Sequence, residues 1–308
     1  MRKILFYIIF LIVLSIIIVR SDFDLSVIRH ADLFQLLSLS AVMLLSYTGT
    51  YLSVLVQFRI LEVRESKSNL LLLSLATNLL NYLPAKGGVL SLGTFLKAKK
   101  KVSINKFIFT TMLTYGIVTV VTVLMSFFFL FDEKMKSFYD RVNFSAIIII
   151  TILLLSGSII TYYIAKKNSD NFLMKYYLMF ISNRHMILKN KLNLFFLSLA
   201  VVTGIVLYSA RMYISFSIAG HPISLYHSFM IGVIANLSFF LSFTPGGLGV
   251  KEGFVGGVSY LLFGNAAIGI VASLIDRVIN LIFAIITGSI SIKILDNRFF
   301  TKNQEVTE

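Results

Sequence analysis

The sequence contains no cysteine, which excludes disulfides, thiolate nucleophiles and cysteine-ligated metal sites. Charge is also scarce: 14% of the 308 residues are charged and 57% are hydrophobic, and the mean hydropathy is +0.87. Apolar runs of roughly 20 residues, the length that crosses a bilayer, recur from end to end. No polar block is long enough to form a soluble domain. We therefore predict a single integral membrane domain over residues 1–308.

Common catalytic patterns are missing as well. There is no cluster of histidines and carboxylates at metal-ligand spacing, no nucleophile elbow and no phosphate-binding P-loop. We therefore predict no catalytic residue, no metal and no cofactor, and we favour a transporter over an enzyme.

The charge that is present is mostly basic, with a net charge of +14. In a membrane protein such an excess indicates cytoplasmic loops and contact with anionic lipid headgroups rather than nucleic acid. The first 22 residues start with basic residues and continue as an apolar run, but they lack a small-x-small cleavage site. We expect a retained first helix with a cytoplasmic N-terminus.

Hydropathy predicts an all-α polytopic fold with six full transmembrane helices, at about 4–19, 33–56, 107–131, 144–165, 192–218 and 265–292. Two further apolar segments, about 70–96 and 228–263, are interrupted by proline and glycine, which break helices. Segment 166–191 mixes aromatics with cations and is predicted to lie on the cytoplasmic surface.

The first interrupted segment is predicted to be a re-entrant hairpin. A single crossing would put "KAKKKVSINK" (97–106) outside, against the positive-inside tendency. Each arm, of about 14 residues, would be only about 20 Å long, too short to span. The same argument makes 228–263 a hairpin entered from the outside.

The two hairpins predict an inverted repeat with halves 1–131 and 144–295. Residues 296–308 would form a short cytoplasmic tail. We expect a multi-pass protein of the cell membrane with both termini in the cytoplasm.

Paired interruptions in two halves point to a substrate site near the membrane midplane. The backbone candidates are Pro84, Gly87, Gly88, Pro245, Gly246, Gly247 and Gly249. The candidate substrate-binding residues are the ionisable residues of the predicted membrane segments: Lys86, Arg211, Lys251, Glu252, Asp276 and Arg277. Four cations against two carboxylates, beside helix N-termini, favour a phosphate or another anion.

Structural alternatives stay open for these side chains. Lys86 and Arg211 could extend to the membrane surface, and Glu252 could form a buried ion pair with Arg277. Asp276 is expected to pair with Arg211 or Lys251. Asparagines 78, 81 and 236 are expected to tie helices together, and the tyrosines to belong to the interfacial belt.

Three motifs resemble a known family, the lysylphosphatidylglycerol synthase transmembrane (flippase-like) family. "SFTPGGLGVKEGF" is similar to its P-G-G-L-G-V-x-E signature, "LPAKGG" to its earlier P-x-K/R-x-G element, and the arginine of "LIDRVINLIFAIITG" to that of its last conserved helix. By position, the resemblance implies roles for Pro84, Lys86, Gly87, Pro245, Gly246, Gly247, Gly249, Glu252 and Arg277.

The resemblance implies a lipid translocase that moves a phospholipid or lipid-linked headgroup between leaflets. A membrane-embedded transferase, or an accessory subunit of a partner synthase, is the alternative, and homo-oligomers are also compatible. Two departures from the family pattern argue against assigning to this chain the best-known substrate of the family, aminoacylated phosphatidylglycerol. After the first element many relatives have an acidic residue and then an arginine, whereas in this chain Val89 and Leu92 stand nearby. We also expect this chain to act without a soluble aminoacyl-transferase domain.

Overall fold

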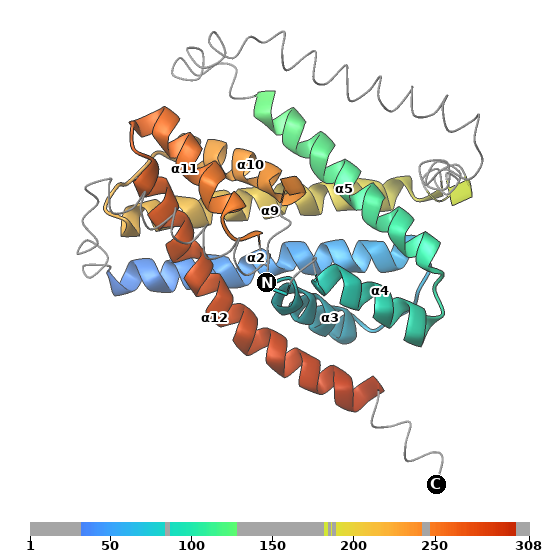
Figure 1. Ribbon diagram of the computed structural model, residues 1–308. Helices are drawn as coiled ribbons and strands as arrows, with labels where there is room; N and C mark the ends of the chain where they lie inside the picture. The colour runs from blue at the N-terminus through green and yellow to red at the C-terminus, as the bar shows by residue number, and fades with distance from the viewer. Residues whose placement is uncertain are drawn as a thin grey trace, which may run out of the picture.

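The computed structural model describes residues 32–83, 87–127, 182–183, 186, 189–241 and 247–299. Within these residues it contains eight helices and no strand (Figure 1): α2 (Leu33–Ile60), α3 (Lys67–Leu80), α4 (Gly87–Lys100), α5 (Ile104–Ser126), α9 (Lys191–Ile218), α10 (Leu225–Leu241), α11 (Val250–Phe263) and α12 (Ala266–Phe299). The helices expected at 4–19 and 144–165, and most of segment 166–191, lie outside the described residues.

Four of these helices, α2, α5, α9 and α12, are long and apolar enough to cross a membrane. They correspond to four of the six predicted transmembrane helices. With 23 to 34 residues each, they are about 35–50 Å long and exceed the hydrocarbon thickness of about 30 Å. The prediction of a polytopic all-α fold is confirmed for this part of the chain.

The other four helices are short and come in two pairs. In each pair, α3 with α4 and α10 with α11, the helices have only 14 to 17 residues, or about 21–26 Å. The breaks between them, 81–86 and 242–249, contain Pro84 and Pro245. Both interrupted segments predicted from the sequence are therefore broken helices.

Helix α3 begins and helix α4 ends at the same end of the molecule, here called the basic end. The Lys100 ammonium, at the end of α4, forms an ion pair with Glu65, just before α3. Burial alone would raise the pKa of Glu65, but hydrogen bonds from Lys100 and Asn69 hold this pKa below its ordinary value. The last turn of α12 reaches the same place, where Arg298 Nη1 donates to Asn69 Oδ1.

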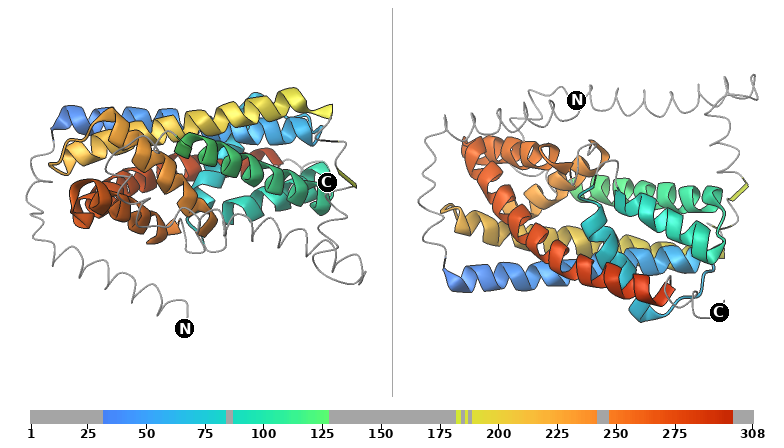
Figure 2. Two further views of the ribbon diagram at one scale, coloured as in Figure 1. Left: turned by 90° about the horizontal axis from the view of Figure 1, so that it is seen from above. Right: turned by 60° about the horizontal axis from the view of Figure 1, so that its bottom comes forward.

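Helix α10 begins and helix α11 ends at the opposite end of the molecule, here called the His221 end. His221 and His227, on either side of the start of α10, pack edge-on against Phe263 at the end of α11, with ring centroids 5.0 and 5.4 Å apart. Gln35, in the first turn of α2, donates to Ser217 at the end of α9 (2.9 Å). Figures 1 and 2 show the two short pairs in opposite halves of the molecule.

Antiparallel packing of α2 and α9 joins the two ends. Two buried apolar clusters lie on either side of the molecular centre. One, around Met212, Phe216 and Met230, lies towards the His221 end, and the other, around Phe58, Leu96 and Leu197, lies towards the basic end. Large apolar side chains such as Ile282 and Ile286 cover the outside of α12, as expected for a surface that faces lipid.

Sequence reasoning misplaced the ends of several helices. The basic segment 97–106, expected to be a loop, is mostly helical: α4 runs to Lys100 and α5 starts at Ile104. Helix α12 continues to Phe299, beyond the predicted end at 292. Lys97, Lys99 and Lys100 lie in the last turn of α4. Positive side chains there interact favourably with the helix dipole, which stabilises the helix end despite its polar sequence.

The turn between α3 and α4 depends on close backbone contact. A Cβ atom at Gly88 would lie 2.3 Å from the Thr77 carbonyl oxygen and 2.4 Å from Asn81 Oδ1. A side chain at this position would push α4 away from α3. By contrast, a Cβ at Gly116 in α5 would meet no atom within 4 Å.

We expect Gly88→Ala to lower the free energy of unfolding by about 1–3 kcal/mol, because overpacking against backbone cannot be relieved by a rotamer change. Gly116→Ala, the matched control, should be neutral or stabilising by up to about 1 kcal/mol, since alanine is the better helix former. Thermal unfolding followed by circular dichroism in detergent measures both. Equal melting temperatures for the two variants would contradict the close packing.

Candidate functional site: a polar cavity between the two helix breaks

A polar cavity of about 360 Å³ lies where the two breaks approach each other. Its wall comes from both short pairs and from three long helices: Ser46, Tyr47, Thr50, Asn78, Asn81, Tyr82, Val89, Tyr208, Arg211, Ala235, Asn236, Ser238, Gly247, Lys251, Asn280 and Ala284. Tyr47 and Asn280 sit near the midpoints of α2 and α12. Tyr47 is thus roughly 20 Å along the helix from either end of α2, and the cavity is central.

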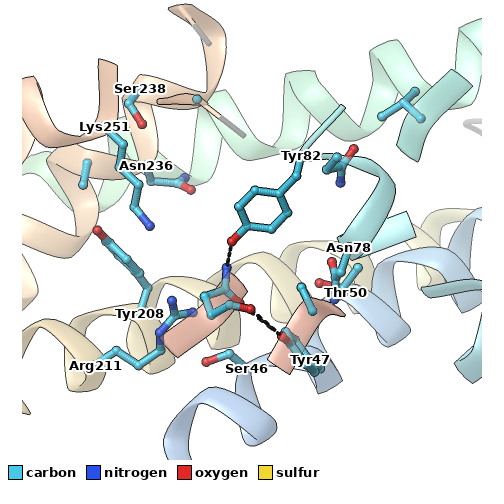
Figure 3. Close-up of a pocket in the computed structure, with 16 residues that line it drawn as sticks. Ser46, Tyr47, Thr50, Asn78, Tyr82, Tyr208, Arg211, Asn236, Ser238 and Lys251 are labelled. Carbon is cyan, nitrogen blue, oxygen red and sulfur yellow. Dashed lines mark hydrogen bonds between the residues drawn. The ribbon is translucent and has the colours of Figure 1, made fainter. Parts of the chain in front are cut away.

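The cavity has two chemically different sides (Figure 3). Lys251, Tyr208 and Arg211 form one side, and Tyr82, Asn78 and Thr50 form the other. Between them, the Asn280 side chain accepts a hydrogen bond from Tyr47 (3.2 Å) and donates one to Tyr82 (2.8 Å). This relay joins α2, α12 and the first break.

Lys251, Arg211 and Tyr208 are here called the cationic wall of the cavity. Asp276 of α12 does not line the cavity and forms ion pairs with both cations of this wall. Arg211 makes a bidentate pair with it, Nε to Oδ1 at 2.7 Å and Nη2 to Oδ2 at 2.8 Å. Lys251 Nζ lies 3.5 Å from Oδ2, at the limit of a hydrogen bond. The side chains of Asp276 and Arg211 are 1% and 8% exposed, whereas that of Lys251 is 26% exposed. Lys251 is therefore the more weakly held and more accessible cation.

Tyr208 lies beneath this cation. Lys251 Nζ is 3.9 Å from the centroid of the Tyr208 ring, and Arg211 Cζ is 5.5 Å from it. A cation over an aromatic face is stabilised by the ring quadrupole, by up to about 2 kcal/mol when desolvated. The ring therefore helps to keep the ammonium group at the cavity wall.

A second buried pair lies next to the first. Arg277 Nε is 2.6 Å from Glu252 Oε1, and the two side chains are 11% and 1% exposed. The other carboxylate oxygen of Glu252 accepts the Gly249 amide at 2.7 Å. Glu252 thus caps the start of α11, and the amide of Gly249, which we expected to face an anion, is used within the protein.

The second break has a backbone that requires glycine. Gly247 and Gly249 have φ angles of +69° and +92°, a region that side chains rarely adopt. Gly247 lines the cavity and is buried. These conformations directly precede α11, whose first turn carries Lys251 and Glu252.

Two polar atoms of the cavity wall have no hydrogen-bond partner among the described residues. They are Asn78 Nδ2 and the Tyr208 hydroxyl, both buried. A buried polar group without a partner costs about 1–3 kcal/mol. Donors of this kind are expected where a ligand or water supplies the acceptor.

The structure separates the predicted charged residues into two groups. Arg211 and Lys251 line the cavity, whereas their shared partner Asp276 and the pair of Glu252 and Arg277 do not line it. Arg211 does not extend to the membrane surface, because Asp276 holds it inside. Lys86, Pro84, Pro245 and Gly246 lie outside the described residues, and Gly87 and Gly88 form the first turn of α4.

Sequence reasoning missed several cavity residues. Tyr47, Tyr82 and Tyr208, assigned to an interfacial belt, instead line the cavity, which corrects that expectation for these three. Asn236 ties helices as expected, because its amide donates to Thr122 of α5 (2.7 Å). The signal that could have found the tyrosines is position: Tyr82 adjoins the first break, and Tyr208 precedes Arg211 by one helical turn.

The family model of the lysylphosphatidylglycerol synthase transmembrane region matches residues 4–288 of the 308. The chain belongs to this family. No curated protein and no solved structure matches it. Family membership and four candidate spans make this a multi-pass membrane protein.

Two apolar residues of α4 follow the first break. Val89, in the first turn of α4, lines the cavity, and Leu92 is buried in the apolar cluster of the basic end. The first short pair therefore contributes no charged pair at these positions. Within the described residues, the charges of the site come from α9, α11 and α12.

We expect Asp276→Asn to be strongly destabilising, because it removes the carboxylate that buried Arg211 shares with the half-buried Lys251. Breaking a buried ion pair by removing one partner costs about 3–5 kcal/mol. The matched control is Glu62→Gln, which removes an exposed partner of Lys189 and should cost no more than about 1 kcal/mol. Melting temperatures in one detergent compare the two; a similar small effect for both would show that Asp276 is dispensable.

Proposed function

We propose that the protein is a lipid translocase and that the central cavity is its headgroup site. The observation that supports this most is that both helix breaks contribute to one polar, cation-bearing cavity inside an apolar exterior. Irregular backbone and charge at membrane depth are costly and are kept where they line a site. The acyl or prenyl chains would stay in the bilayer.

The charge distribution supports the proposed orientation. Basic side chains gather at the basic end: Arg59, Arg64, Lys67, Lys97, Lys99, Lys100, Lys101, Lys106, Lys191 and Arg298. Among the described residues, the His221 end includes no lysine or arginine. The positive-inside tendency therefore favours a cytoplasmic basic end. We propose that α3–α4 enters the membrane from this side and α10–α11 from the other.

The order of helices supports an inverted repeat. A long helix, two short helices and a second long helix occur twice, as α2 to α5 and as α9 to α12, with their short pairs opening at opposite ends. In transporters, such halves rock against each other around a fixed site and expose it to each side in turn. We propose the same alternation here.

The ionisable residues then have distinct roles. Lys251 would contact the headgroup phosphate directly, with Arg211 beside it, because these two cations line the cavity. Glu252, Asp276 and Arg277 would act as positioning residues that fix the first turn of α11. Lys86 remains a proposed third contact from the first break.

Removing the accessible cation should slow transport. In proteoliposomes with tail-labelled phospholipid, we expect Lys251→Met to slow leaflet exchange about tenfold or more, the effect of losing one charge-assisted hydrogen bond of about 1.5–3 kcal/mol. Dithionite quenching of the outer leaflet measures the rate.

The control is Lys106→Met, which removes an exposed lysine of α5 and should leave the rate unchanged. Matching melting temperatures would exclude unfolding as the cause. Exchange no faster than in protein-free liposomes, with correctly folded wild type, would overturn the proposal and favour an accessory role.

A further inference from the structure

We propose that the cavity selects a phosphodiester with a single negative charge and an uncharged, hydroxyl-bearing headgroup, and that it rejects headgroups with a net positive charge. This inference rests on the proposed lipid translocation and specifies its substrate class. It differs from what the resemblance to aminoacyl-lipid translocases implies, because it follows from the side chains of this cavity.

The described part of the cavity wall offers no accessible carboxylate. Of the described residues that line the cavity, none is aspartate or glutamate. The two carboxylates nearby, Asp276 and Glu252, are each 1% exposed and already bind Arg211, Lys251 and Arg277. The undescribed residues of the two breaks, 84–86 and 242–246, contain no acidic residue in the sequence. A headgroup ammonium would therefore meet cations and no counter-charge.

The described ion-paired groups beside the cavity carry one excess positive charge. Among the described residues, three cations and two carboxylates form the two adjacent ion-paired groups, which leaves one positive charge of these groups to be balanced. Lys251 is the group that can respond to a ligand, because it lines the cavity and lies 3.5 Å from Asp276. One phosphodiester oxygen could take the ammonium without breaking the bidentate pair of Arg211.

The remaining polar lining of the cavity is neutral. Apart from Lys251 and Arg211, the polar wall consists of hydroxyl and amide groups from serine, threonine, tyrosine and asparagine. Asn78 Nδ2 and the Tyr208 hydroxyl lack partners within the described structure, so they call for acceptor oxygens. Phosphate and hydroxyl oxygens supply acceptors, and hydroxyls also donate to the asparagine carbonyls.

The volume of the cavity limits the size of the headgroup. A volume of about 360 Å³ is near the lower end of small-molecule sites, about 300–1,000 Å³. A glycerol or single-sugar headgroup fits this space, whereas a long oligosaccharide does not. Phosphatidylglycerol is the simplest lipid with the required chemistry.

The test compares three tail-labelled lipids with the same acyl chains: phosphatidylglycerol, zwitterionic phosphatidylethanolamine and cationic lysyl-phosphatidylglycerol. Binding is measured by native mass spectrometry of delipidated protein with an equimolar mixture, and transport by leaflet exchange. We expect phosphatidylglycerol to exceed the cationic lipid about tenfold or more in both, a difference of at least one charge-assisted contact.

A variant tests the cause of the selectivity. Asn78→Asp adds a carboxylate to the cavity wall with little change in shape, so it should reduce or reverse the preference for phosphatidylglycerol over the lysylated lipid. Asn105→Asp makes the same change at an exposed position at the start of α5 and should leave the preference unchanged. Unaltered selectivity in a folded Asn78→Asp protein would overturn the assignment.

The outcomes separate this inference from the proposed function. Selective binding without leaflet exchange would keep the inference and remove translocation. Exchange of all three lipids at equal rates, or faster exchange of the lysylated lipid, would keep translocation and overturn the inference. Glycerophosphoglycerol, the headgroup without acyl chains, should compete weakly; competition as strong as that of the lipid would make the ligand a soluble phosphodiester.

Discussion

A charged side chain inside a membrane is stable only next to an opposite charge, and in this protein Asp276 lies next to two cations. Its carboxylate joins Arg211 of α9 and Lys251 of α11 to α12. A charged side chain at the bilayer centre costs about 2.5–3.5 kcal/mol or more. The ion pairs therefore hold these three helices together, because separating the helices would leave the charges unpaired. The position of the second break, and with it the cationic wall of the cavity, follows from this contact.

The two ion-paired groups also explain why the site is asymmetric. The second short pair contributes Lys251 and Glu252 to the charged network, whereas the start of α4 offers glycine and Val89. The α2–α3 side of the cavity is instead neutral and hydrogen-bonding, through Tyr47, Tyr82 and Asn78. A headgroup between these walls would meet positive charge on one side and neutral donors and acceptors on the other.

Much of this arrangement could be predicted from the sequence, because its strongest signals are local. Proline with glycine breaks a helix wherever it occurs, so both breaks were predictable, as was the pairing of Asp276 with Arg211 or Lys251, since buried opposite charges must meet. The tyrosines of the wall were not predictable, because an interfacial and a central tyrosine look alike until neighbouring helices are placed. The capping of α11 by Glu252 was equally hidden, since a carboxylate three residues after a glycine can face either the backbone or a cation.

The central claim is that two broken helix pairs enter the membrane from opposite sides and meet at one cavity. The cysteine-free sequence allows single exposed cysteines to be placed at Arg64→Cys before α3, Ala98→Cys in the last turn of α4 and Pro222→Cys before α10, and tested with an impermeant maleimide in oriented vesicles. Labelling of Arg64→Cys and Ala98→Cys from the cytoplasmic side, and of Pro222→Cys from the outside, is the result this account predicts. Labelling of Ala98→Cys from the same side as Pro222→Cys would contradict it, because α3 and α4 would then cross the membrane together as one span.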